Sequence, residues 1–456
     1  MTDRVDVLVC GAGMAGLCAG ATAALTGART LVVEKGPRPG GSMRMSGGTI
    51  WTAPSMAVME RYVPAGDRER QRQLVDGLAA GLDWLAGLGV PLGERIDNAN
   101  QVGRGVDVAV LTDRLMEVIT GNGGGVRTST ALERLEMDAA GRVTGATVRS
   151  TAGPRSRVES GAVVLATGGF GGNPELLARY VGRYADSMLR RANPHSVGDA
   201  FLAALAIGAR TSPNLSTFYG HTMPVTDRPI PPERWTAVTQ YASGDAILVN
   251  EHGERFFDES RSLADELAPL HIVQQPGGRA FLVMDRRVYE DEPLPGRSPQ
   301  PMRPNLDNAV AAGGRTVTAH TLGALADGMA AWGVSRRGLL ATIGDLNAAL
   351  EAGEGADLRI PRTGSAFGVV EPPFRALAVR AGITFTLGGI DVDAGFHVLD
   401  RDGDPIPGLF AAGADAGGTY QAGYAGGLVL GLVQGRIAGA AAAGMTRVPT
   451  AAGEMG

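Results

Sequence analysis

A short apolar run that ends in glycines, close to the start of the chain, constrains the fold more than any other feature. Residues 4–10, RVDVLVC, predict a buried strand because the run is short and mostly apolar. Residues 11–28, GAGMAGLCAGATAALTGA, predict a tight turn followed by a helix of small residues, and residues 29–35, RTLVVEK, predict a second strand. A strand, a helix and a strand in this order predict a βαβ unit with parallel strands.

The glycines at the first strand–helix turn indicate a ligand that carries phosphates. Gly11 allows the turn, Gly13 lets a pyrophosphate approach the backbone, and Gly16 lets the helix pack against the strand. The N-terminus of the helix then faces the phosphates. Glu34 ends the second strand about 20 residues further on, where a carboxylate can accept hydrogen bonds from both ribose hydroxyls. The segment therefore predicts dinucleotide binding, against the alternative of an ordinary structural turn.

Three further glycine segments favour a flavin over a nicotinamide dinucleotide. Five glycines fall within residues 36–48, directly after the second strand. Glycine costs conformational entropy on folding, and a large isoalloxazine clamped along its length gives such a cluster a reason. The segments LATGG (165–169) and IPGLFAAGADAGG (406–418) also follow apolar runs, and Asp415 is expected to reach the ribityl hydroxyls. Together they predict FAD, with three ordinary loops as the alternative.

The expected cofactor contacts come from these glycine segments and from residues beside them. The glycine-rich loop offers amide nitrogens and serine hydroxyls to the pyrophosphate and the ring. The full set is Gly11, Ala12, Gly13, Met14, Ala15, Gly16, Glu34, Lys35, Gly40, Gly41, Ser42, Met45, Ser46, Gly47, Gly48, Ala131, Ala166, Thr167, Gly168, Asp199, Gly413, Asp415, Gly427 and Leu428.

Residues 221–365 differ from the rest of the chain in composition and in the secondary structure that they predict. Prolines crowd 224–232 and 293–304, and helical runs are expected only at 321–331 and 337–351. Apolar strand segments followed by glycines occur again after this region. We therefore interpret residues 221–365 as a domain inserted into the glycine-rich one.

The predicted fold class is α/β, with a Rossmann-like FAD-binding domain that combines a parallel sheet with an antiparallel meander at 125–151. An α+β capping domain is inserted into it. The expected divisions are 1–220 for the first part of the FAD-binding domain, 221–365 for the cap, and 366–456 for the part that completes the FAD-binding domain.

Charge and composition argue against several classes of partner. The formal net charge is −5 and no basic block occurs, so neither nucleic acid nor an acidic membrane surface is expected as a partner. The apolar tail 423–445 is interrupted by Gln434 and Arg436, which favours a buried helix over a membrane span. Cys10 and Cys18 have no metal-ligating company, so neither a metal site nor a disulfide is expected. These features fit a cytoplasmic protein.

Taken together, the segments resemble a flavoprotein family that includes the flavoprotein subunits of fumarate reductase and succinate dehydrogenase, the 3-ketosteroid Δ1-dehydrogenases and tricarballylate dehydrogenase. The matching pieces span the chain: GAGMAG, EKGPRPGGSMRMSGG, LATGGFGGN, GDA at 198–200, ILVNEHGERFFDE at 247–259, GITFTLGGIDVD and IPGLFAAGADAGG. The resemblance implies a large FAD domain that carries a mobile cap, with the active site at the flavin.

Departures from the family pattern point to a different substrate. Respiratory members hold FAD covalently through a histidine in the glycine-rich loop, whereas residues 1–194 contain no histidine, so non-covalent FAD is expected. Where fumarate reductases have a carboxylate-gripping histidine, an arginine acid and a second substrate arginine, this chain has Phe385, Leu263 and Tyr424. Buried carboxylates need paired cations. The substitutions therefore predict a less charged substrate, such as a ketone, an enone or a related carbonyl compound.

Four residues are candidates for catalysis. Dehydrogenation beside a carbonyl needs a base for the α proton, a donor for the developing enolate oxygen, and a flavin for the β hydride. Tyr424 resembles the tyrosine of the ketosteroid branch and is the expected donor, with packing on the flavin as the alternative. His221 lies where the family has a polar substrate contact, and Tyr219 shares its strand face if the run is extended. Structural roles for both stay open. Arg261 is the nearest cation to the lost arginine acid.

Three functions remain open from the sequence. The leading one is an FAD-dependent oxidoreductase that dehydrogenates the C–C bond next to a carbonyl in a weakly charged small molecule, or performs the reverse reduction. The second is a fumarate-reductase-like enoate reductase that uses Arg261 as its acid. The third is a flavin-binding electron-transfer subunit without catalysis of its own. A separate electron acceptor or donor is expected in each case, since the chain has no cysteine cluster for an iron–sulfur centre.

Overall fold

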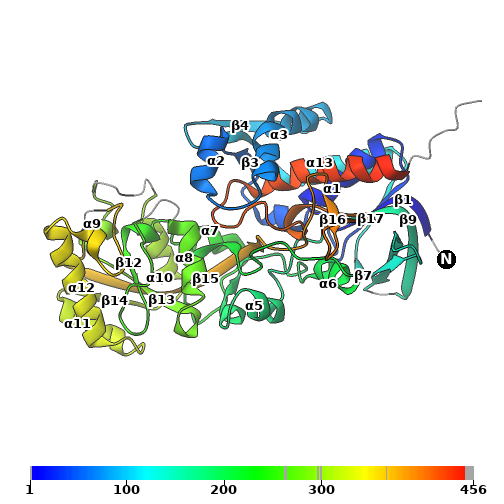
Figure 1. Ribbon diagram of the computed structural model, residues 1–456. Coiled ribbons are helices and arrows are strands. Elements are labelled where there is room, and N and C mark those ends of the chain that lie inside the picture. Colours follow the sequence, from blue (N-terminus) through cyan, green and yellow to red (C-terminus); the bar gives the residue numbers. More distant parts are fainter. Residues whose placement is uncertain are drawn as a thin grey trace, which may run out of the picture. The chain divides into compact units, whose positions relative to one another are not determined.

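The computed structural model describes residues 3–151, 153–260, 264–294, 297, 300–365 and 367–446. They form two compact units, which are described separately below (Figure 1). Unit 1 consists of the described residues within Met1–Leu176, Ala192–Phe218 and Phe385–Gly456, and unit 2 of those within Leu177–Arg191 and Tyr219–Thr384.

Unit 2 is longer than the expected cap, 221–365, because of one long strand. β15 (Phe374–Thr386) is antiparallel to β13 (Arg279–Met284), with Phe281 opposite Ala378. β15 is also parallel to the short strand β10 (Leu189–Arg190). These pairings, rather than composition, assign most of β15 and the segment Leu177–Arg191 to unit 2.

An eight-stranded sheet forms the centre of unit 1. Its main path runs β16-β17-β9-β1-β2-β6, and the pairs from β17 to β6 are parallel. β8 pairs antiparallel with β9 and with β7, which is the meander expected at 125–151. The strands are β1 (Asp3–Cys10), β2 (Thr30–Val33), β6 (Gly125–Arg127), β7 (Thr130–Met137), β8 (Val143–Ser150), β9 (Arg155–Leu165), β16 (His397–Leu399) and β17 (Pro405–Ala411). The predicted α/β class and its Rossmann-like start are confirmed.

The remaining elements of unit 1 are a second, smaller sheet and several helices. A small antiparallel sheet has the order β3-β5-β4. Its strands are β3 (Thr49–Thr52), β4 (Leu92–Asp97) and β5 (Val102–Val106), and the helices are α1 (Met14–Leu25), α2 (Met56–Tyr62), α3 (Arg68–Gly87), α4 (Val108–Gly121), α6 (Asp199–Ala206) and α13 (Gly427–Thr446). Helix α5 (Pro174–Tyr180) begins in unit 1 and ends in unit 2.

Helices α1 and α13 lie side by side because small residues line their contact (Figure 1). A Cβ atom at Gly435 would lie 2.3 Å from the carbonyl oxygen of Ala15, and one at Gly439 would lie 2.4 Å from that of Ala19. Only glycine permits this approach. Helix α13 is long and apolar enough to cross a membrane, but 67% of its most apolar stretch is buried inside the protein, as in the core helix of a globular domain.

Unit 2 is built on a six-stranded, mostly antiparallel sheet with the path β10-β15-β13-β12, to which β11 and β14 add by pairing with β15. Its further strands are β11 (Phe218–Pro224), β12 (Ile247–Val249) and β14 (Thr316–Ala319). Its helices are α7 (Trp235–Val238), α8 (Ala264–Ile272), α9 (Arg286–Tyr289), α10 (Arg303–Ala311), α11 (Leu322–Ala330) and α12 (Arg336–Glu351), the last two being those expected at 321–331 and 337–351. Phe281, Leu325, Leu339 and Ile343 belong to its buried core.

Candidate active site

The glycine turn between β1 and α1 has the geometry that a pyrophosphate needs. Gly11 has φ +111°, and a Cβ on it would lie 2.1 Å from the carbonyl oxygen of Ala166. A Cβ on Gly16 would lie 1.9 Å from the carbonyl oxygen of Gly11. Gly13, by contrast, caps α1 without a side-chain hydrogen bond, and a Cβ there would meet nothing nearer than Gly41 Cα at 4.0 Å. The helix N-terminus is therefore unshielded by side chains, which fits an anion such as the FAD pyrophosphate.

Glu34 lies at the end of β2 with its carboxylate turned back toward the glycine turn. The residue is 7% exposed, and its Oε2 accepts the Ala12 N–H at 2.9 Å while Oε1 accepts the Gly36 N–H at 2.6 Å. A carboxylate oxygen has two lone pairs, so each oxygen keeps one for a ribose hydroxyl. Lys35, the next residue, and Asp199 were also expected to contact the cofactor. In the structure they form an ion pair with each other, with Lys35 Nζ 2.9 Å from the Asp199 carboxylate.

The glycine-rich loop approaches the turn and is held partly by its own side chains. It forms a short 3-10 helix, η1 (Gly41–Met45), and a Cβ on Gly41 would lie 3.1 Å from Gly13 Cα. Ser46 Oγ donates to the Met43 carbonyl at 2.7 Å and accepts the Gly48 N–H at 3.2 Å. Ser46 therefore stabilises the loop, and its expected contact with the cofactor stays a prediction.

Asp415 ties the ends of two central strands together. It lies in η7 (Gly413–Asp415) after β17, is fully buried, and accepts N–H groups from Thr167, Gly168 and Gly169, which follow β9. Burial raises the pKa of the Asp415 carboxyl, and the three backbone N–H bonds and the Thr167 hydroxyl oppose that shift. These bonds already occupy both carboxylate oxygens, so the expected ribityl contact of Asp415 requires one of them to open.

Gln434 is a buried residue of this region whose role was not predicted from the sequence. From α13 its Oε1 accepts the Gly413 N–H at 2.9 Å, and its Nε2 donates to Thr419 Oγ1 at 2.9 Å. It thus fixes the loop that contains Asp415. An amide within a mostly apolar helix was the available signal.

The other expected cofactor residues lie in the same region of unit 1. Ala12, Met14 and Ala15 belong to the glycine turn and α1, Gly40, Ser42, Met45 and Gly47 to the loop, Ala131 to β7, Ala166 to the end of β9, and Gly427 and Leu428 to the start of α13.

Tyr424 belongs to an aromatic cluster of unit 1 made of Trp51, Phe385, Tyr420 and Tyr424. The Tyr424 ring lies edge-on to Trp51, with centroids 5.6 Å apart, and at 6.1 Å from both Phe385 and Tyr420. Trp51, Phe385 and Tyr424 are half-buried, whereas Tyr420 is buried. Two of its members border Gly427, where a Cβ would lie 3.2 Å from the Tyr424 hydroxyl and 3.4 Å from the Phe385 ring.

His221 lies on β11 of unit 2 and is 4% exposed. Its Nδ1 is 3.0 Å from Asp265 Oδ2, on α8. Tyr219 and Tyr241 lie edge-on to the imidazole, with ring centroids 5.0 and 5.2 Å away. The structure thus brings the predicted pair His221 and Tyr219 together. Arg261 and Leu263 lie outside the described residues.

Asp265 and its neighbour Glu266 were not expected from the sequence. Asp265 Oδ1 is buried, and no described residue hydrogen-bonds to it. Burial, with the Asp265 charge as a second cause, raises the pKa of Glu266 to about 8. His221 and Asp265, with Glu266 as the next residue on α8, form a titratable cluster of unit 2 that suits proton transfer.

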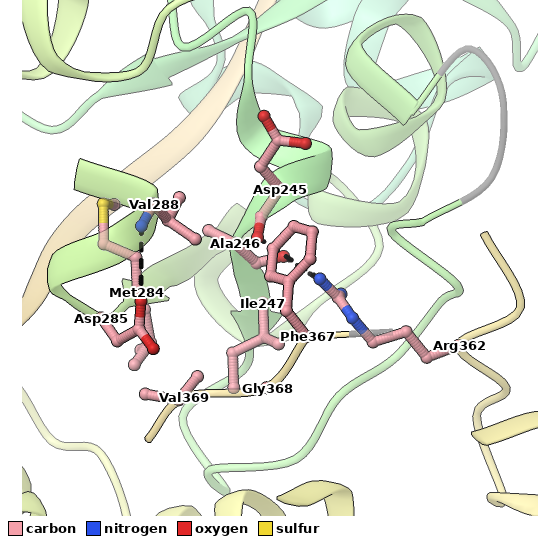
Figure 2. A pocket seen from close by; sticks show the side chains of 11 residues that line it. Asp245, Ala246, Ile247, Met284, Asp285, Val288, Arg362, Phe367, Gly368 and Val369 are labelled. Carbon is pink, nitrogen blue, oxygen red and sulfur yellow. Dashed lines mark hydrogen bonds between the residues drawn. The ribbon is translucent and has the colours of Figure 1, made fainter. Parts of the chain in front are cut away.

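A narrow pocket elsewhere in unit 2 is not suited to a substrate (Figure 2). Its lining residues include Asp245, Asp285, Arg362 and Phe367. Arg362 is buried, and Figure 2 shows its guanidinium directed at the Asp245 and Ala246 carbonyl oxygens, both at 3.3 Å. Glu259 lies 3.5 Å from the same guanidinium. The Arg362 guanidinium therefore stabilises the fold of unit 2.

Comparison with known proteins identifies the family. Residues 6–428 match the FAD binding domain family. The chain is 28% identical over 446 residues to a probable fumarate reductase of Shewanella frigidimarina, covering 92% of this chain and 71% of that protein. It is 28% identical over 539 residues to 4-oxocyclohexanecarboxylate 2-dehydrogenase of Sinomonas cyclohexanicum, covering 92% and 89%.

A solved structure shares the fold. The 3-ketosteroid-Δ4-(5α)-dehydrogenase of Rhodococcus jostii RHA1 aligns with a TM-score of 0.73 at 24% identity, covering 97% of each chain. The chain therefore belongs to the FAD binding domain family and is a flavoprotein oxidoreductase whose relatives act on CH–CH groups.

Proposed function

We propose that the protein catalyses α,β-dehydrogenation, or the reverse reduction, of a C–C bond next to a carbonyl in a weakly charged small molecule. The observation that carries this proposal is the aromatic cluster. Phe385 and Tyr424 pack around Gly427, at positions where the resemblance to fumarate reductases would require cations for a substrate carboxylate. An uncharged ring or chain is the better partner for aromatic side chains, because a buried carboxylate without a cation is costly.

The residues of unit 1 fit FAD. The uncapped N-terminus of α1 would hold the pyrophosphate, and the free lone pairs of Glu34 would hold the ribose. When bound, FAD supplies the acceptor or donor of the hydride at the β carbon. The absence of histidine in residues 1–194 supports non-covalent binding.

Tyr424 and His221 take the roles that the reaction requires of the protein. The Tyr424 phenol donates a hydrogen bond to the substrate carbonyl oxygen as enolate charge develops. His221 accepts the α proton in dehydrogenation and returns it in reduction. Tyr219, in ring contact with His221, helps to hold the imidazole in place.

A fumarate-reductase-like enoate reduction is the second candidate, because the chain is 28% identical to a probable fumarate reductase. In that reaction Arg261 would supply the proton to an unsaturated carboxylate. The two functions predict different substrates but the same cofactor.

Anaerobic mixing separates the candidates. A saturated ketone should bleach the yellow colour of the oxidised protein under the first proposal. An unsaturated carboxylate should restore the colour of the dithionite-reduced protein under the second. Retained flavin without either response, across ketones, cyclohexanones and carboxylates, would instead indicate an electron-transfer subunit.

The electrons are proposed to pass to or from a separate partner. The two cysteines of the chain are both buried and free, which also supports a reducing, cytoplasmic setting.

A further inference from the structure

We propose that Asp265 is a positioning residue that fixes the tautomer of His221, so that Nε2 is the atom that exchanges a proton with the substrate. The inference rests on the proposed function, since it specifies how His221 acts in that reaction. It assigns a role to a residue for which neither the sequence pattern nor the proposed function provides one.

The contact between the two side chains decides the tautomer. Asp265 Oδ2 lies 3.0 Å from His221 Nδ1. An ionised carboxylate only accepts hydrogen bonds, so Nδ1 must carry the proton. In the neutral imidazole the lone pair is then on Nε2, and within the described residues the His221 ring hydrogen-bonds through Nδ1 alone. The histidine is thus held with its basic nitrogen away from Asp265.

Packing fixes the plane of the imidazole as well as its tautomer. The rings of Tyr219 and Tyr241 lie edge-on to it, at interplanar angles of 75° and 73°. With His221 buried at 4% exposure, rotation of the ring would break the bond to Asp265 and both aromatic contacts. Such an arrangement preorganises a proton-transfer group.

Within the described residues, the side chain of Asp265 has no hydrogen-bond partner other than His221. Its Oδ1 is buried and receives no hydrogen bond from a described residue. The other His–Asp pair provides the contrast: Asp393, in unit 1, bonds to the His397 ring but also accepts the N–H groups of Gly395 and His397, so it shapes a turn. Asp393 therefore has a structural role in its turn, whereas the side chain of Asp265 hydrogen-bonds to His221.

Two other acidic residues lie on α8 or on the element that packs against it. Glu266 follows Asp265 directly, and burial raises the pKa of Glu266 to about 8, with the Asp265 charge as the second cause. Asp245 of η4 (Ser243–Asp245), which packs against α8, forms an ion pair with Arg297 at 3.5 Å. Near neutral pH a protonated Glu266 adds no second negative charge next to Asp265.

The proton balance follows from this geometry. In dehydrogenation the α C–H bond breaks, its proton goes to His221 Nε2, and its electron pair enters the C–C–O system as an enolate. Bound FAD would accept the β hydride with its two electrons, so that the C=C bond can form. His221 becomes an imidazolium, whose charge Asp265 stabilises. Reduction reverses each transfer.

The tautomer can be measured without any substrate. The chain has six histidines, so a long-range ¹H–¹⁵N correlation spectrum of histidine-labelled holoprotein is simple enough for His221 to be assigned by its loss in His221→Gln. We expect His221 to carry its proton on Nδ1. Asp265→Asn should abolish that preference, while Asp393→Asn, the matched change at the other pair, should leave the His221 signals in place.

Kinetics supply the second readout. On a substrate that bleaches the wild-type flavin, Asp265→Asn should lower kcat by about 10²-fold with little change in KM, as expected for a general base in the wrong tautomer. Asp393→Asn should keep wild-type kcat. A wild-type protein without turnover would count against the proposed function but would leave the tautomer measurable. A proton on Nε2 in the wild type, or unchanged kcat in Asp265→Asn, would overturn the inference while the proposed function stood.

Discussion

The backbone N–H of Gly427 donates a hydrogen bond of 2.7 Å to the phenol oxygen of Tyr424. The bond joins the first residue of α13 to the side chain three residues before it. Because the N–H approaches the oxygen, the phenol's own proton is directed away from Gly427. The bond thereby sets the direction in which Tyr424 can donate, and it links the proposed enolate donor to the start of a core helix.

Tyr424→Phe should reduce turnover by about 10²–10³-fold while FAD remains bound. The variant should also melt lower, because the Gly427 N–H loses its acceptor, which costs about 0.5–1.5 kcal/mol of stability. Steady-state kinetics and thermal melting of the holoprotein measure both effects. Tyr289→Phe, which removes a hydroxyl bonded to Asp307 in unit 2, is the matched control and should retain turnover. Full activity in Tyr424→Phe would leave Tyr424 as a packing residue.

Glu34→Ala should yield mostly colourless protein. The substitution removes the acceptor of two backbone N–H groups and, under the proposal, of the ribose hydroxyls. A hydrogen bond to a charged group is worth about 1.5–3 kcal/mol, so losing several should weaken FAD binding by orders of magnitude. The ratio of flavin to protein absorbance measures the loss. Glu133→Ala, which removes a surface ion pair with Arg155, should stay yellow. A yellow Glu34→Ala protein would contradict the proposed ribose contact.

Acid precipitation should release all the flavin. The prediction follows from the lack of a histidine in residues 1–194, which leaves the glycine-rich loop without the residue that forms the covalent bond in the respiratory relatives. Flavin fluorescence is then expected in the supernatant and none in the washed pellet. Flavin that stays with the pellet would show a covalent bond through another residue.

Glu266→Gln should change how stability depends on pH. In the folded protein the pKa of Glu266 is raised to about 8 from an ordinary value of 4.5, chiefly by burial. The folded state therefore keeps a proton that the unfolded chain has lost, and this contribution to stability is present below about pH 4.5 and disappears as the pH rises through about 8. Glutamine stays neutral throughout.

The variant should accordingly melt higher than the wild type at about pH 9, by several degrees, and show a smaller difference at about pH 5. Thermal melts across this range give the comparison. Glu254→Gln, at an exposed ion pair with Arg359 in unit 2, should follow the wild-type curve. Parallel wild-type and Glu266→Gln curves would mean that Glu266 is ionised in the folded protein.

The local features of the FAD-binding part could be predicted from the sequence because they depend on neighbouring residues. The strand at 4–10, the glycine turn and the second strand at 29–35 were found as β1, α1 and β2, since apolar periodicity and glycine spacing act over short distances. The helices α11 and α12 were found for the same reason.

The features that escaped prediction depend on contacts between distant segments. Asp265 is 44 residues from His221, and no spacing rule connects them. The segment Leu177–Arg191 belongs to unit 2 because β10 pairs with β15, in which Gly382, the partner of Leu189, lies 193 residues later in the chain. Asp415 was expected to face the cofactor, but its buried bonds to Thr167, Gly168 and Gly169 appear only when the ends of β9 and β17 are brought together.

Proton removal next to a carbonyl of a weakly charged substrate can be measured by anaerobic mixing of the oxidised protein with cyclohexanone and with its α-deuterated form. Cyclohexanone should bleach the flavin and yield the conjugated enone. The α-deuterated ketone should react more slowly, because the α C–H bond breaks in the rate-limiting chemistry. Bleaching by no ketone, together with reoxidation of the dithionite-reduced protein by an unsaturated carboxylate, would rule out ketone dehydrogenation and favour the enoate reductase.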